Sequence, residues 1–106
     1  MPIREDEARE LADIFKILAH PDRIRMIEEL RNGELDVSAL AVRIGISAAR
    51  ISQHLSLLRS QRLVSQRRDG RNHHYRLTEP DIAGWIADGI DILSSQAVTL
   101  ESSGCH

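Results

Sequence analysis

One turn signal restricts the fold of this 106-residue chain more than any other feature. The pair Asp69-Gly70 stands between two segments, 63–67 and 73–77, that we predict to be β-strands. Asp-Gly between two such segments is a strong signal for the tight turn of a hairpin. The rest of the chain has helical patterns, so the predicted fold class is mainly α with one small β-hairpin.

Apolar residues at intervals of three and four predict five helices. They cover residues 5–19, from Pro21 to Asn32-Gly33, 37–44, 48–60 and 79–95. Proline favours the first turn of a helix, glycine ends one, and a serine at position 47 suits an N-cap. This order of elements, α-α-α-α-β-β-α, is that of a winged helix-turn-helix.

A single domain over 1–95 is expected at this length. Within it, 36–60 forms the helix-turn-helix, 62–77 the wing, and 96–106 a flexible tail. The longest segment without charge has nine residues, Ile92 to Leu100, too short to span a membrane. With no secretory signal and one cysteine, Cys105, we expect a cytoplasmic protein without a disulfide or a multi-thiolate metal site.

The net charge of −2 conceals a strong segregation of charge. Residues 43–76 hold eight arginines and one acid, a net charge of +7, between segments of −4 and −5. Arginine suits forked contacts with phosphate and guanine. The middle third therefore indicates a nucleic-acid partner, although a solvated basic face is the alternative.

The helix over 48–60 places Ile51, Leu55 and Leu58 on one buried face. The opposite face is small, polar and free of acids, as a helix lying against base edges requires. His54 stands about 60° from the Ile51 line, where packing is favoured over base reading. The expected DNA-binding residues are Ser47, Ala48, Ala49, Arg50, Ser52, Gln53, His54, Ser56, Arg67, Arg68, Arg71 and Asn72.

The ordered motifs resemble the ArsR/SmtB family of bacterial winged-helix repressors. The resemblance rests on four stretches across residues 11–93: Phe15 to Ile27, Ile44-Gly45-Ile46-Ser47, Ile51 to Arg59, and Leu63 to Leu77. It implies a homodimer that binds a palindromic operator and is released by an inducer, which the sequence does not name. The helices over 4–19 and 79–95 would form the dimer. The expected interface residues are Leu11, Phe15, Ile82, Trp85, Ile86, Gly89, Ile90 and Leu93.

The chain departs from the metal-sensing members of that family. Asp36-Val37-Ser38 stands where those members carry a Cys-x-Cys pair. Of the four ligands of a second type of site only Asp81 is present, and the other positions are Ala83, Ser94 and Ala97. One ligand does not hold a transition metal tightly, so we expect no metal and no cofactor.

Other interpretations remain beside that of a DNA-binding repressor. One is a winged-helix module for protein–protein contact, which would not need the arginine block. Another is a weak metal-responsive regulator with a non-standard site. Its ligands would be Asp81, Asp88 and Asp91, or Cys105 and His106. We predict no enzymatic activity, because no catalytic arrangement stands out.

Overall fold

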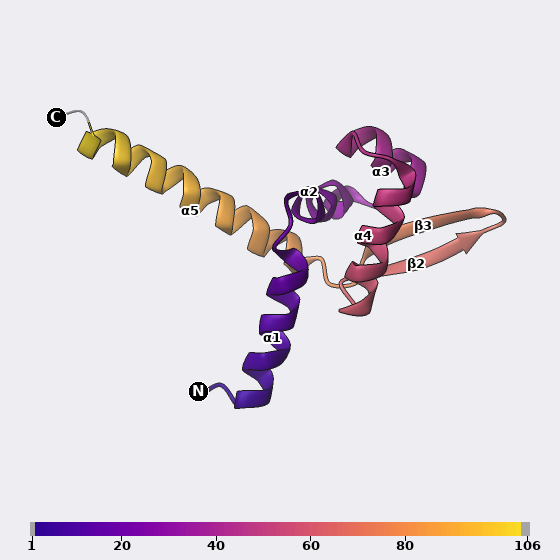
Figure 1. The fold of residues 1–106 in the computed structure, drawn as a ribbon, viewed down its shortest axis with the longest axis horizontal. Helices are drawn as coiled ribbons and strands as arrows, with labels where there is room; N and C mark the ends of the chain where they lie inside the picture. Colours follow the sequence, from indigo (N-terminus) through magenta and orange to yellow (C-terminus); the bar gives the residue numbers. More distant parts are fainter. Residues whose placement is uncertain (1, 105–106) are drawn as a thin grey trace.

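The computed structural model describes residues 2–104, with the side chains of residues 2–96. Five α-helices, a 3-10 turn and three strands follow one another along the chain (Figure 1). They are α1 Glu5–Leu18, α2 Pro21–Glu29, η1 Leu30–Asn32, β1 Leu35–Asp36, α3 Val37–Ile44, α4 Ala48–Ser60, β2 Val64–Asp69, β3 Asn72–Leu77 and α5 Asp81–Gly104. The winged helix-turn-helix predicted from the sequence is confirmed.

Local capping fixes the ends of the two helices of the helix-turn-helix. The carboxylate of Asp36 accepts a hydrogen bond of 2.7 Å from the backbone N–H of Ala39 at the start of α3. Gly45, with a φ of +84°, ends that helix in the left-handed conformation that glycine adopts readily. The hydroxyl of Ser47 then accepts from the backbone N–H of Arg50 at 3.2 Å, and α4 begins.

An aliphatic core lies among α2, α3, α4 and the sheet. Its fully buried members include Met26 and Ile27 from α2 and Leu40 from α3. From α4, Ile51, Leu55 and Leu58 are at most 1% exposed, as the sequence predicted. Tyr75 is the one aromatic residue in the core of the described chain, since Phe15 and Trp85 are half-exposed.

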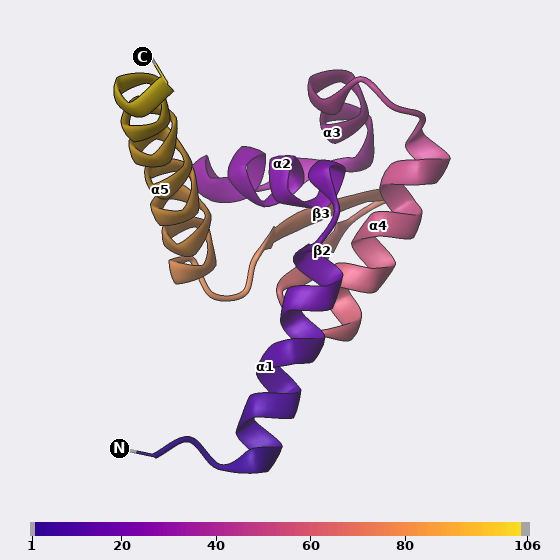
Figure 2. The same ribbon diagram turned by 60° about the vertical axis from the view of Figure 1, so that its left-hand side comes forward.

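The sheet has three strands in the order β1-β3-β2, all antiparallel. The hairpin strands are longer than predicted and enclose a shorter turn, at Gly70 and Arg71. β1 was not predicted. Its two residues pair with Tyr75 and His74 of β3 and carry no sequence pattern of their own. The strand joins the start of the helix-turn-helix to the wing. Figure 2 shows α3 and α4 on one side of the hairpin and α5 on the other.

The last helix differs from its prediction at both ends. It begins at Asp81 and not at residue 79. The backbone N–H of Thr78 donates to the carbonyl of Leu63, so Thr78 still belongs to the sheet side of the connection. The expected end at residue 95 is wrong, because α5 continues to Gly104. The flexible tail over 96–106 stays a prediction. No proline or glycine interrupts residues 90–103, so the small polar residues there continue the helix. Cys105 and His106 lie outside the described residues.

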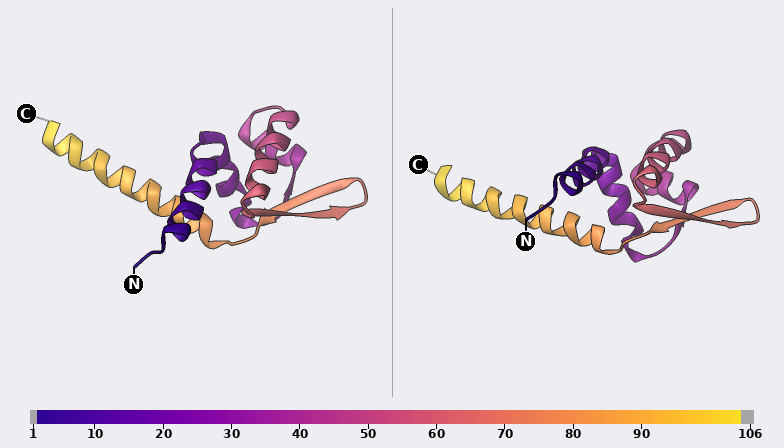
Figure 3. Two further views of the ribbon diagram at one scale, coloured as in Figure 1. Left: turned by 60° about the horizontal axis from the view of Figure 1, so that its bottom comes forward. Right: turned by 90° about the horizontal axis from the view of Figure 1, so that it is seen from below.

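α1, α5 and the wing project from the core in different directions. In Figure 3 the outer part of α5 and the hairpin extend to opposite sides of the helix-turn-helix. Within the described residues, none of the helices combines the length and apolar character that crossing a membrane requires.

Shortening a side chain to alanine should lower the free energy of unfolding more on the inner face of α4 than on its outer face. We expect Leu55→Ala to lower the free energy of unfolding by about 2–5 kcal/mol, because it opens a cavity in the core. Leu57→Ala, on the same helix at 39% exposure, should cost less than about 1.5 kcal/mol. Urea denaturation of both variants measures the difference, and equal costs would contradict this orientation of α4.

Candidate DNA-binding surface

The outer face of α4 is fully available to a partner. All the side chains predicted to read DNA from this helix, except His54, are exposed. They are Ser47, Ala48, Ala49, Arg50, Ser52, Gln53 and Ser56. No acidic residue belongs to α4, so this face offers hydroxyl, amide and methyl groups without repelling a polyanion.

His54 is not part of that face, which corrects its place among the DNA-binding residues. It is 7% exposed, and its Nδ1 accepts a hydrogen bond of 3.1 Å from Nε of Arg23. Burial, followed by the positive fields of His20 and Arg23, lowers the pKa of His54. The ring therefore packs between α4 and α2, the role favoured from the sequence.

The wing holds the other predicted contacts. Arg67, Arg68, Arg71 and Asn72 are all exposed around its turn. The Nε of Arg68 donates to the carbonyl of Gly70 at 3.1 Å, which holds that side chain beside the turn. On the neighbouring strands, Gln66 and His73 form a side-chain hydrogen bond. The tip therefore presents cations on an ordered hairpin.

One wing arginine is already engaged within the protein. Arg67 forms a forked pair with Glu34, with Nη2–Oε1 at 2.9 Å and Nε–Oε2 at 3.1 Å. This hydrogen bond and the arginine charge lower the pKa of Glu34, and the same hydrogen bond raises the pKa of Arg67. Glu34 immediately precedes β1, so the pair joins β2 to the chain leading into β1 across the sheet.

The remaining arginines of residues 43–76 differ in whether they form ion pairs. Arg43 pairs with Glu29 at 3.2 Å, and Arg50 lies 4.0 Å from Asp22. Five others form no ion pair within the described residues: Arg59, Arg62, Arg68, Arg71 and Arg76. All five are exposed and belong to the end of α4, the loop after it or the hairpin, so the unpaired positive charge gathers at one end of α4 and on the wing.

A second, apolar surface lies along α1 and α5. Phe15, Trp85, Ile90 and Leu93 are each at least half-exposed, and the rings of Phe15 and Trp85 lie 6.4 Å apart. They line a groove of about 260 Å³ that Leu18 and Gly89 also reach. Of the other predicted interface residues, Leu11, Ile86 and Gly89 are half-buried. Ile82 is 4% exposed and belongs to the core, so its place at an interface is a correction.

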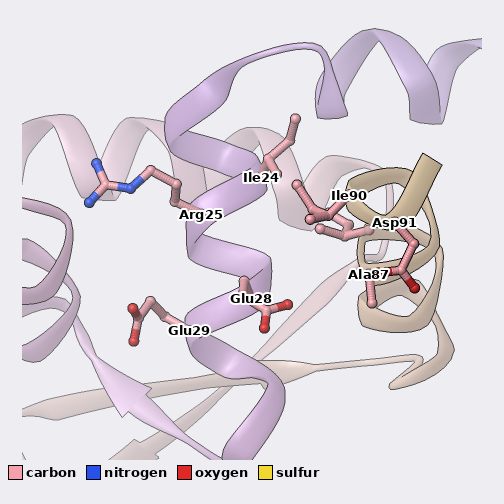
Figure 4. A pocket seen from close by; sticks show the side chains of 8 residues that line it. Ile24, Arg25, Glu28, Glu29, Ala87, Ile90 and Asp91 are labelled. Carbon is pink, nitrogen blue, oxygen red and sulfur yellow. The ribbon is translucent and has the colours of Figure 1, made fainter. Parts of the chain in front are cut away.

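A larger pocket of about 500 Å³ lies between α2 and α5 (Figure 4). Ile24, Ile86 and Ile90 form its apolar side, and Glu28 and Asp91 face one another across it. Its other lining residues include Arg25 and Glu29.

The described residues contain one group of three potential metal ligands. It consists of His20, Asp22 and His54, of which only His54 was singled out from the sequence. Asp81, Asp88 and Asp91 form no such group within the described chain. No sequence signal brings these residues together, because Asp22 and His54 are 32 residues apart. Only the packing of α2 on α4 places them side by side.

Comparison with known proteins agrees with this architecture. The pattern of the bacterial regulatory proteins of the arsR family matches residues 20–66. A transcriptional repressor SmtB homolog from Synechocystis is 43% identical over 88 residues, which are 83% of this chain and 67% of the relative. The chain belongs to the ArsR family. It is a DNA-binding transcriptional repressor of that family, and not an enzyme.

Solved structures of the ArsR type superpose over most of the chain. Rv0081 of Mycobacterium tuberculosis has a TM-score of 0.79 at 34% identity and covers 91% of this chain and 97% of its own. The homodimeric winged helix-turn-helix DNA-binding domain Mb0332 of Mycobacterium bovis has a TM-score of 0.74 at 27% identity, covering 91% of each chain.

The Glu34–Arg67 pair gives the wing a dependence on pH. Because the pKa of Glu34 is lowered in the folded protein, the pair stabilises the fold above the ordinary glutamate pKa of 4.5. That contribution disappears as the pH falls through the lowered pKa. We expect Glu34→Gln to have a slightly lower melting temperature than the wild type at pH 7 and the same one in acid. Glu79→Gln, at an exposed acid without an ion pair in the described chain, is the control and should show no such convergence.

Proposed function

We propose that this repressor binds a palindromic operator as a homodimer, with α4 in the major groove and the wing against the adjacent backbone. The observation that carries the proposal is the exposed, acid-free outer face of α4, together with five exposed arginines without an ion pair in the described chain, at the end of that helix and on the hairpin. Cations around an uncharged reading face supply the two components of specific binding, phosphate attraction and base recognition. Such a regulator acts in the cytoplasm, where its operator lies.

The residues divide between those two tasks. Gln53 can pair with adenine, Arg50 with guanine, and the methyl groups of Ala48 and Ala49 with thymine. Arg68, Arg71 and Asn72 reach phosphates or the minor groove from the wing. Arg67 is held by Glu34 in the free protein, so its contact with DNA requires that pair to open.

The apolar surface of α1 and α5 supports the homodimer. An exposed patch that includes Phe15, Trp85, Ile90 and Leu93 favours a covering partner. Gly84 and Gly89 add to this, because a Cβ on either would meet no atom within 4 Å in the described chain. The Mycobacterium bovis relative is homodimeric. A two-fold axis here would place two copies of α4 about 34–36 Å apart, one turn of DNA, which is why the operator would be palindromic.

Two substitutions separate phosphate contact from base reading. Arg71→Ala should weaken binding to every DNA sequence and reduce the slope of log affinity against log salt by about 1. Gln53→Ala should instead reduce discrimination between operator variants by about 1–3 kcal/mol at one position. Fluorescence anisotropy on an operator selected from random DNA, at several salt concentrations, measures both.

Arg9→Ala, on the exposed part of α1, is the matched control and should leave the salt slope unchanged. The wing assignment is wrong if Arg71→Ala leaves the slope at the wild-type value. The reading role is wrong if Gln53→Ala weakens all sites equally.

A charge in the apolar surface should prevent dimerisation. Ile90 is 53% exposed, so Ile90→Glu leaves the core intact while placing a carboxylate in the proposed interface. We expect monomers in sedimentation velocity. Val42→Glu, at an 83% exposed apolar residue of α3, is the control and should remain dimeric. Persistent dimers of the Ile90 variant would overturn the interface.

A further inference from the structure

Three side chains with metal-binding chemistry meet under the recognition helix. His20 and Asp22 lie at the start of α2, and His54 comes from the inner face of α4. One donor atom from each lies within 4.8 Å of the other two. The closest printed pair is Nε2 of His54 and Oδ2 of Asp22 at 3.9 Å, and the two imidazole rings have centroids 4.6 Å apart.

A second observation is a buried nitrogen that faces this cluster. The Nε2 of His54 is buried and has no hydrogen-bond partner within the described residues. A buried polar nitrogen without a partner costs free energy, so native proteins nearly always satisfy such groups. At 3.9 Å the carboxylate of Asp22 is too far away to do so directly.

The spacing suits a shared ion better than a direct hydrogen bond. Donors of a tetrahedral zinc ion, with bonds of about 2.0–2.1 Å, lie about 3.3 Å from one another. The His54–Asp22 pair needs to close by about half an ångström to reach that value, and the widest pair by about 1.5 Å. His20 and Asp22 are half-buried at the beginning of a helix, so side-chain rotation supplies that movement.

We propose that His20, Asp22 and His54 bind a divalent transition-metal ion such as Zn²⁺, with water in the fourth position. Two imidazoles and one carboxylate are a ligand set that zinc uses in sites with one open position. Without thiolate, the set favours Zn²⁺, Ni²⁺ or Co²⁺ over Cu⁺. The site lies within one protomer and uses no residue of α5.

Metal binding requires a proton to change place on each ring. In the structure both Nδ1 atoms are acceptors, that of His20 from the backbone N–H of Asp22 and that of His54 from Arg23. With Nδ1 as the acceptor, the proton of each ring lies on Nε2. Coordination through Nε2 would move that proton through solvent to Nδ1, with no net release. At His20 this would also end the hydrogen bond from the N–H of Asp22, so α2 would lose that cap. The hydrogen bond from Nε of Arg23 to His54 would then be lost, whereas Arg23 would keep its 2.8 Å hydrogen bond to the carbonyl of Ile17.

The ion would act on the DNA-binding surface through Asp22. That carboxylate lies 4.0 Å from Nη2 of Arg50 and 3.9 Å from Nη1 of Arg25. A metal that takes up Asp22 removes the partner of Arg50, which stands on the outer face of α4. The metal should therefore strengthen DNA binding, and DNA should strengthen metal binding by the same factor. This consequence, unlike the site itself, depends on the proposed function.

The site is tested first without DNA, in the full chain carrying Cys105→Ser and His106→Ala to remove the terminal metal donors. Titration calorimetry with Zn²⁺ should give one ion per chain. Co²⁺ should give visible bands of tetrahedral cobalt with nitrogen and oxygen ligands and no thiolate band. His20→Asn and Asp22→Asn should each weaken binding more than about tenfold.

The variants separate loss of a ligand from loss of the fold. Asparagine at position 20 can still cap α2, so His20→Asn removes the imidazole and preserves the helix. Circular dichroism of each variant verifies the fold. His74→Asn, at a half-buried histidine of the wing, is the matched control and should bind zinc as before. Absence of stoichiometric binding, or equal binding by the folded His20 variant, would overturn the site.

The coupling is tested second, by anisotropy with operator DNA in Zn²⁺ and in chelator. We expect tighter binding with zinc in the Cys105→Ser, His106→Ala chain and no zinc effect once His20→Asn is added. Equal affinities in zinc and chelator, with the metal site occupied, would overturn the coupling and leave the site. Failure to bind any DNA would contradict the proposed function and not the metal site.

Discussion

The burial of one face of α4 is the interaction on which the rest of this structure depends. With only three aromatic residues, two of them half-exposed, the chain must build its core from aliphatic side chains. Ile51, Leu55 and Leu58 fix the rotation of α4 about its axis against α2 and α3. That one rotation presents Gln53 and Ser52 to solvent and turns His54 toward Asp22. The reading face and the proposed metal site are therefore two consequences of the same packing.

Charge follows the same division of the molecule. The acidic ends of the chain form α1 and α5, whereas the arginine block forms the end of α4 and the wing (Figure 1). A polyanion approaching the wing side meets positive potential, and on the α5 side it is repelled. A net charge of −2 is thus compatible with an oriented approach to DNA. The Glu34–Arg67 pair belongs to this arrangement, since one arginine of the wing pairs with Glu34 and so holds the hairpin to the chain before β1.

Local signals made α3 and α4 predictable to the residue, because Asp36, Gly45 and Ser47 mark their ends chemically. The sequence carried no equivalent signal for β1, which exists only because β3 is beside it. The end of α5 was not predicted, because no helix breaker marks it. Ile82 was assigned to the dimer interface and not to the core, because an apolar stripe on a helix does not show which partner covers it. The group of His20, Asp22 and His54 was not predicted, since a contact across more than thirty residues has no periodicity.

A ligand between α2 and α4 differs physically from one between the dimerisation helices. An ion shared by two α5 helices would change the distance between two recognition helices, so its effect would require both halves of an operator. An ion held by His20, Asp22 and His54 changes the partner of Arg50 within one protomer. Metal binding would then change the affinity of each protomer for its own half of the operator, without rearrangement of the dimer. The absence of a four-ligand set on α5 therefore does not remove metal control from such a chain, because the proposed site between α2 and α4 would be a second place where charge and DNA binding are coupled.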